Sequence, residues 1–128
     1  MLRHQGREYT VGDVVWTVDP FKLGITVPRL FAIVSTRTHP FEGEQFVGVT
    51  VTTTDHMVAH PLLDEYWEYG GAPERSYLLP LSLHTPRVSA IQAPPNDESI
   101  TDPWQGRLAR EIMEQVIEEI VWTLRKVE

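Results

Sequence analysis

Apolar residues along this chain fall into short runs of strand length, and only the C-terminal region has helical spacing. Residues 11–18 are rich in Val and Trp, 30–35 are continuously apolar, and 45–54 are β-branched in their second half. Such runs are typical of strands, and a continuously apolar one indicates a strand buried on both faces. Three further segments are expected to add strands: 57–63, 76–83 and 87–91.

Polar and turn-forming residues separate these runs. Segments 19–24, 36–44 and 68–75 each combine Gly with Pro, and we expect them to be loops. Residues 1–9 are polar and are interpreted as an N-terminal arm. Residues 93–102 contain Pro94-Pro95-Asn96-Asp97 and are interpreted as a connector.

The pattern predicts one long C-terminal helix over residues 103–126. Asp102 would be its N-cap, Pro103 its first helical residue and Gln105 its third, which together form a capping-box signature. Apolar residues then recur every four positions and form a broad stripe. The stripe consists of Leu108, Ile112, Val116, Ile120 and Leu124, flanked by Met113, Ile117 and Val121.

The width of this stripe predicts a homodimer. A small barrel covers one row of such a helix, so the second row would remain as an exposed patch that favours association. The alternative is a monomer whose own sheet and the connector 93–102 cover both rows.

Five or six short strands with one amphipathic helix predict a mainly β fold with a C-terminal helix. The strands would form a small, curved antiparallel sheet or barrel with the helix across it. The 128 residues fit a single domain, 1–128. With no cysteine, no long apolar segment and no secretory signal pattern, a cytoplasmic protein is expected.

The formal net charge of −7, from 18 acidic and 11 basic residues, argues against strong nonspecific binding to nucleic acid. A nucleic-acid enzyme would then need a small basic site within an acidic whole. A second account is a salt-adapted organism, in which acidic surfaces serve solubility and phosphate attraction is already screened.

The order of these segments, with the helix last, resembles the PemK/MazF family of toxin endoribonucleases. The resemblance rests on three stretches: Gly12-Asp13-Val14-Val15-Trp16, then Pro28-Arg29-Leu30 with an apolar run to Ser35, and Val47 to Thr54. It implies an SH3-like barrel and metal-independent cleavage of single-stranded RNA by 2′-OH attack, without a cofactor. It also implies a homodimer that is neutralised by a small antitoxin protein.

Two residues match the catalytic positions of that family. Arg29 stands six residues before Ser35, as the family's catalytic Arg does before its Ser. A guanidinium is a planar, permanent cation that can neutralise charge developing on a phosphate. Thr52 matches the catalytic Thr, and its hydroxyl can donate to a phosphate oxygen. Each also has a simpler interpretation, as a surface arginine and as an ordinary strand residue.

Four further residues are candidates for substrate binding. Phe21 and Lys22 lie in the first loop, where an aromatic ring and a cation suit single-stranded RNA. Thr54 stands where the family has Gln, and His84 lies on a later strand and can exchange protons near neutral pH. The alternative for His84 is a surface or capping residue.

The chain departs from the family pattern at Leu30, Thr54, Leu81 and Ser82, where the family has Pro, Gln, an acidic residue and Gln. These departures favour the second candidate function, a noncatalytic SH3-like binding or regulatory module that keeps only the fold.

No metal site is expected. His56 and His60 would share a face of a helix, but Pro61 and the preceding β-branched residues indicate an extended segment. On a strand the two side chains lie about 13 Å apart, too far for one ion.

Overall fold

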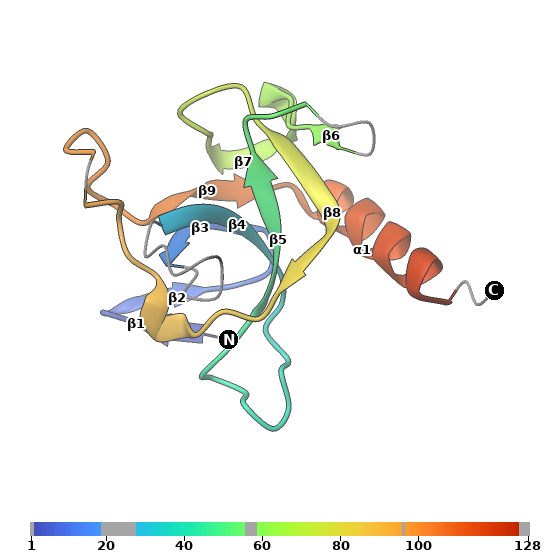
Figure 1. The fold of residues 1–128 in the computed structure, drawn as a ribbon, viewed down its shortest axis with the longest axis horizontal. Coiled ribbons are helices and arrows are strands. Elements are labelled where there is room, and N and C mark those ends of the chain that lie inside the picture. Colours follow the sequence, from blue (N-terminus) through green and yellow to red (C-terminus); the bar gives the residue numbers. More distant parts are fainter. Residues whose placement is uncertain (1, 19–27, 56–58, 96, 126–128) are drawn as a thin grey trace.

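A computed structural model gives the fold of residues 2–18, 28–55, 59–95 and 97–125 (Figure 1). Seven strands form one strongly curled antiparallel sheet in the order β6-β8-β5-β4-β3-β9-β7, and helix α1 lies against its β8 side. The predicted mainly β fold with a small curved sheet and a C-terminal helix is therefore confirmed.

The sheet strands are β3 (Asp13–Val18), β4 (Pro28–Ser35), β5 (Val47–Thr52), β6 (His60–Pro61), β7 (Trp67–Gly70), β8 (Tyr77–His84) and β9 (Trp104–Leu108). A separate hairpin consists of β1 (Leu2–His4) and β2 (Arg7–Tyr9). Two short 3₁₀ helices, η1 (Asp64–Tyr66) and η2 (Val88–Ala90), and one α-helix, α1 (Arg110–Arg125), complete the described elements. The strands predicted at 11–18, 30–35, 45–54 and 76–83 are confirmed.

The predicted start of the C-terminal helix is wrong. Residues 104–108 form strand β9 between β3 and β7, and the helix begins at Arg110. Asp102 does accept a hydrogen bond from the backbone N–H of Trp104, at 2.9 Å, but this bond closes a turn that leads into a strand. Gly106 then allows β7 to approach closely, since a Cβ there would lie 2.3 Å from the backbone oxygen of Tyr69.

Three other segments differ from their predictions. Residues 2–9 of the predicted polar arm form a β-hairpin, because Gln5 and Gly6 adopt positive φ at its turn while Leu2 and Tyr9 are buried. The loop predicted at 68–75 contains most of β7, and the strand predicted at 87–91 is mainly η2. The predicted strand 57–63 contains β6, although residues 56–58 lie outside the described part.

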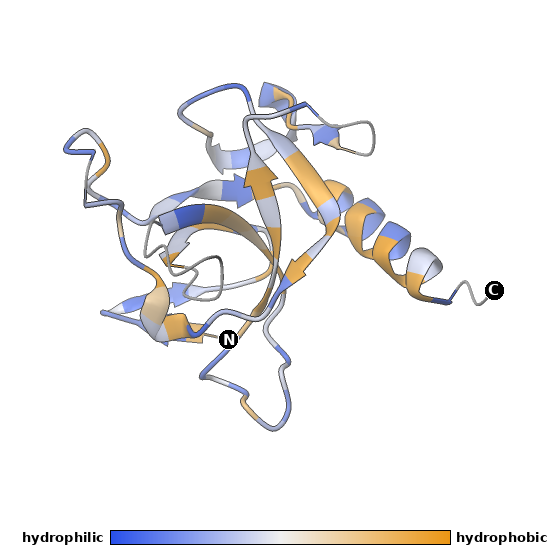
Figure 2. Ribbon diagram, in the orientation of Figure 1, coloured by the Kyte–Doolittle hydropathy of each residue, from blue (hydrophilic) through white to orange (hydrophobic). Residues whose placement is uncertain are grey.

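The central strands β3, β4 and β5 are mostly buried on both faces, which explains the continuous apolar run of β4. One face packs against α1 and forms the larger cluster around Val14, Ala32, Val49, Leu78 and Met113. The other face packs against the β1–β2 hairpin and η2, through Phe31, Ile33, Phe46, Leu2 and Ile91. Figure 2 shows apolar residues on the side of α1 that faces the sheet.

Asp13 connects β3 to β9 from a fully buried position. Its Oδ2 accepts a hydrogen bond from the Thr10 backbone N–H at 2.8 Å. Its Oδ1 accepts bonds from Trp104 Nε1 at 3.0 Å and Arg107 Nε at 2.8 Å. The hydrogen bond to Asp13 raises the pKa of Arg107 above its ordinary value. Within the motif of residues 12–16, Asp13 therefore has a structural role: it joins β3 to β9.

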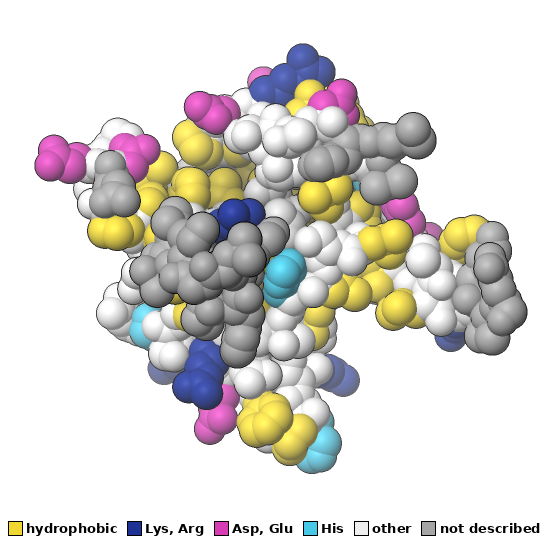
Figure 3. Space-filling model, in the orientation of Figure 1, with side chains coloured by type: hydrophobic (Ala, Val, Ile, Leu, Met, Phe, Trp, Pro, Cys, Tyr) yellow, Lys and Arg dark blue, Asp and Glu magenta, His cyan; other side chains and the backbone are white. Residues whose placement is uncertain are grey.

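The second apolar row of α1 is only partly exposed: Met113 is buried, Ile117 is half-buried and Val121 is exposed. Val121 is 38%, Trp122 64% and Leu124 68% exposed, and Leu81 and Leu83 on β8 are 51% and 37% exposed. Figure 3 shows apolar side chains over β8 and α1 on one side of the molecule. The chain's own sheet thus leaves part of the stripe uncovered. No helix within the described residues is long and apolar enough to cross a membrane.

Candidate active site

Arg29 and Thr52 lie on neighbouring strands and on the same face of the sheet. β4 and β5 pair at Phe31–Thr50 and at Leu30–Val51, so Arg29 and Thr52 are the next positions of this ladder. Side chains alternate along a strand, which places Arg29 and Phe31, Thr50 and Thr52 on one face. The structure therefore brings the two predicted catalytic residues together.

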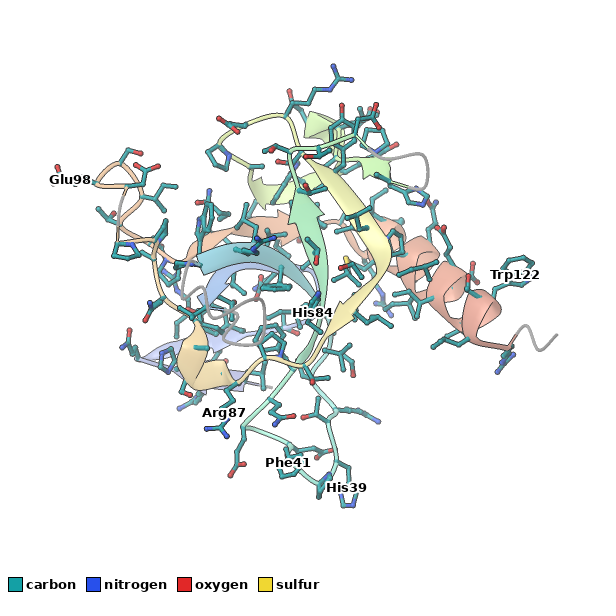
Figure 4. All side chains as sticks on the ribbon, viewed as in Figure 1. His39, Phe41, His84, Arg87, Glu98 and Trp122 are labelled. Atoms are coloured by element: carbon teal, nitrogen blue, oxygen red, sulfur yellow. The ribbon has the colours of Figure 1, made fainter. Side chains whose placement is uncertain are left out.

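A chain of polar groups continues across β5 and β8 on this face. Thr50 Oγ1 and Ser82 Oγ lie 2.8 Å apart, and Ser82 Oγ lies 3.2 Å from His84 Nε2. The His84 ring packs edge-on against Phe31, with ring centroids 5.2 Å apart. Figure 4 shows His84 near the end of β8, beside β5. His84 is thus held by a ring contact and a hydroxyl contact.

A bulge in β8 makes the contact between Thr50 and Ser82 possible. The register with β5 passes from Val49–Leu83 to Thr50–Leu79, so Pro80, Leu81 and Ser82 have no partners in between. Pro80 has no backbone N–H to give to the ladder. Bulges of this kind redirect side chains and are over-represented beside active sites.

The hydroxyl group of Thr52 acts as an acceptor within the protein, so its O–H can still donate a hydrogen bond to a ligand. Its Oγ1 accepts a hydrogen bond from the backbone N–H of Thr54 at 3.1 Å. The oxygen is thus fixed by the turn that ends β5, while its O–H can donate. Thr54 itself is exposed just beyond the strand, where its side chain can meet a ligand approaching Thr52.

Arg29 is exposed, and within the described part of the chain no carboxylate forms an ion pair with it. Its guanidinium therefore remains available to an anion. Thr17, its partner on β3, is fully buried, and its Oγ1 has no hydrogen-bond partner among the residues described.

The other predicted binding residues, Phe21 and Lys22, lie outside the described residues. So does His56 of the pair considered for a metal. His60 Nε2 instead lies 2.7 Å from Glu119 Oε2 on α1. Over the described ranges, His, Asp and Glu side chains form no group of three or more that could hold an ion.

Sequence reasoning missed the linked hydroxyl groups of Thr50 and Ser82. The two-residue spacing along each strand could have indicated these positions. Strand alternation puts Thr50 on the same face as Thr52, and it puts Ser82 on the same face as His84. Their contact across β5 and β8 depends on the bulge, which the sequence pattern does not reveal.

A permanent cation, three hydroxyls and an imidazole thus lie on one face of three adjacent strands, with His84 opposite Gly48, four positions along β5 from Thr52. Such a surface can bind a phosphodiester and move a proton, because it offers both charge-assisted donors and a titratable ring. No protein-family model matches the chain, and no match was found among curated proteins. A function must therefore be argued from these residues and their geometry.

Proposed function

We propose that the protein is a sequence-selective, metal-independent endoribonuclease toxin of a type II toxin–antitoxin system, acting on single-stranded RNA in the cytoplasm. The observation that carries the proposal is the shared face of Arg29, Thr52 and His84 on three adjacent strands. The motifs that resemble the PemK/MazF family support the same assignment.

In the proposed reaction, the 2′-oxygen of the RNA attacks the adjacent phosphorus and the bond from phosphorus to the 5′-oxygen breaks. The 2′-hydroxyl gives up its proton, and the leaving 5′-oxygen gains one. The products carry a 2′,3′-cyclic phosphate and a 5′-hydroxyl. The nucleophile belongs to the substrate, so the protein has to position the phosphate, stabilise charge and transfer protons.

Arg29 would bind the non-bridging oxygens, whose negative charge increases in the transition state. Its planar guanidinium can donate two parallel hydrogen bonds to a phosphate. Thr52 would donate its hydroxyl proton to the same phosphate, with its oxygen fixed by the N–H of Thr54. Together they would hold the phosphorus in line with the attacking oxygen.

His84 is our candidate for proton transfer. Imidazole is the side chain that most readily accepts and donates protons near neutral pH. The contacts with Phe31 and Ser82 fix the orientation of its ring. The hydroxyls of Ser82 and Thr50 extend from His84 toward the Thr52 side of the site, so they supply a route for a proton.

Replacing Thr52 with valine is expected to lower the cleavage rate about 10- to 100-fold, the loss of one hydrogen bond to a charged phosphate, with little change in thermal stability. Valine has nearly the same shape and keeps the strand preference, but it lacks the donor. Single-turnover cleavage and a thermal melt of the same preparations would measure both effects. Thr53→Val, an exposed neighbour, is the matched control; equal rates for the two variants would remove Thr52 from the site.

The second candidate function is a noncatalytic SH3-like binding or regulatory module. The net charge of −7 favours it, as do the departures from the family pattern at Leu30, Thr54, Leu81 and Ser82. Expression in a host separates the two, because an endoribonuclease toxin stops growth and degrades RNA, whereas a binding module leaves RNA intact.

We further propose that the protein is a homodimer and that a small antitoxin protein neutralises it. The exposed apolar end of α1 supports the dimer, together with a groove of about 650 Å³ beside Ile117, Val121 and Trp122. Covering an apolar patch of this kind with a second surface lowers the free energy of the system and so favours association.

Light scattering is expected to give a mass of about twice the 14.7 kDa of one chain. The variant with Trp122→Glu and Leu124→Glu should be monomeric, since both charges would be buried in the interface. Glu111→Lys changes the charge of an exposed residue near the other end of the helix and should stay dimeric. A wild-type mass equal to one chain rules out the dimer.

A further inference from the structure

A hollow lies between the β1–β2 hairpin, the loop that joins β4 to β5, and η2. Its volume is about 480 Å³. The side chains that matter for its chemistry are two arginines, a histidine, a phenylalanine, a carboxylate and an amide. They are Arg3, His4, Phe41, Glu44, Gln45 and Arg87.

Backbone hydrogen bonds fix two walls of this hollow to each other. The N–H of Val88 donates to the Glu44 oxygen at 2.8 Å, and Gln45 and Arg87 form an isolated bridge. Thr38 ties the loop at its base, because its hydroxyl contacts the backbone oxygens of Phe41 and Gln45 at 3.1 and 3.0 Å. The hollow is therefore shaped by the fold before any ligand enters.

The side chains of Phe41 and Arg87 line this hollow and have no structural role within the described residues. The Phe41 side chain is 48% exposed and belongs to neither core cluster. Arg87 is exposed, and its guanidinium has no acidic partner within the described residues. Arg3, in contrast, is paired with Glu8.

These groups match the parts of one nucleotide. An aromatic ring stacks on a base, and an arginine binds the neighbouring phosphate. The Glu44 carboxylate and the Gln45 amide can meet the donors and acceptors on the edge of a base. A ligand with only negative charge fits less well, because Glu44 lies in the same hollow.

The hollow lies beyond the end of the candidate active site at which His84 is located. Arg87 follows His84 by three residues, a separation that an extended chain spans with at most about 11 Å. Figure 4 shows Arg87 and Phe41 on the same side of His84. A single strand of RNA that passes His84 can therefore continue to this hollow.

We propose that this hollow binds one nucleotide of the single-stranded RNA substrate beyond the His84 end of the site, away from the cleaved bond, an inference that rests on the proposed function. Its base stacks on Phe41 and its phosphate contacts Arg87. Selection of that base by Glu44 and Gln45 makes the hollow a determinant of the RNA sequence that is cut.

The test measures binding of a mixed-sequence, fully 2′-O-methylated oligonucleotide, which lacks the attacking hydroxyl and cannot be cleaved. Phe41→Ala is expected to weaken binding about tenfold. Arg87→Ala is expected to weaken it by a similar factor and to reduce the salt slope of log K by about 0.7. Arg37→Ala, an exposed arginine of the same loop outside the hollow, is the matched control and should stay within about twofold of wild type.

Unchanged binding by Phe41→Ala and Arg87→Ala, or an equal loss with Arg37→Ala, would overturn the proposal. So would adenosine and uridine monophosphates that bind as tightly as the oligonucleotide, because the hollow would then be a site for free nucleotides. Cleavage of unmodified RNA is measured in parallel. An inactive wild type whose binding still depends on Phe41 and Arg87 defeats the proposed function but supports the nucleotide site.

Discussion

Replacing Arg29 with alanine is expected to abolish detectable RNA cleavage while the protein stays folded. Arg29 is exposed and belongs to neither core cluster, so its loss should change the free energy of unfolding by no more than about 0.5 kcal/mol. Loss of one preorganised group that stabilises transition-state charge lowers rates by about 10²- to 10³-fold. A cleavage time course and a thermal melt of the same sample measure both quantities.

Two further variants test whether cleavage needs the guanidinium of Arg29 in particular. Arg29→Lys should recover little activity, because an ammonium cannot reproduce the paired hydrogen bonds of a guanidinium to a phosphate. Arg37→Ala removes an exposed charge away from the site and should cleave at the wild-type rate. Wild-type cleavage by a folded Arg29→Ala protein would contradict the assignment of the active site.

Replacing Asp13 with alanine is expected to destabilise the protein by about 3 kcal/mol, because each partly buried donor that loses its acceptor costs about 1–3 kcal/mol. Asp13 is fully buried and accepts hydrogen bonds from Thr10, Trp104 and Arg107. Its removal leaves three donors without an acceptor and loosens β9 from β3. Denaturant unfolding, followed by intrinsic fluorescence, measures the change.

Glu8→Ala is the matched control for Asp13, because it also removes the carboxylate partner of an arginine. The Arg3–Glu8 pair is on the surface, with side chains 79% and 45% exposed, so its loss should cost less than about 1 kcal/mol. If Asp13→Ala does not fold, Asp13→Asn, which keeps one acceptor oxygen, should give a smaller, measurable loss. Equal stability of the Asp13 and Glu8 variants would contradict the structural role of Asp13.

The strands were predictable because their sequence pattern and their packing agree. The apolar run 30–35 is continuous, and β4 indeed packs on α1 with one face and on the N-terminal hairpin with the other. The start of the helix was not predictable from local signals. Asp102 and Pro103 fit a helix cap, but pairing with β3 and β7 makes 104–108 a strand. Tertiary contacts outweigh a local capping preference here.

The candidate site was predictable where neighbouring strands alone determine it. Arg29 and Thr52 are neighbours on one face because β4 and β5 are consecutive and antiparallel. The contact between Thr50, Ser82 and His84 depends on a bulge at Pro80 to Ser82, and the hollow beside Arg87 combines segments far apart in the chain. Single-sequence periodicity carries no information on either arrangement.

Incubation of the purified wild-type protein with single-stranded RNA in excess chelator tests the central claim most directly. We predict cleavage at undiminished rate, with fragments that end in a 2′,3′-cyclic phosphate and begin with a 5′-hydroxyl. Intact RNA in the presence of folded protein would contradict the proposed function. Cleavage that stops with chelator and returns with a divalent ion would contradict the mechanism.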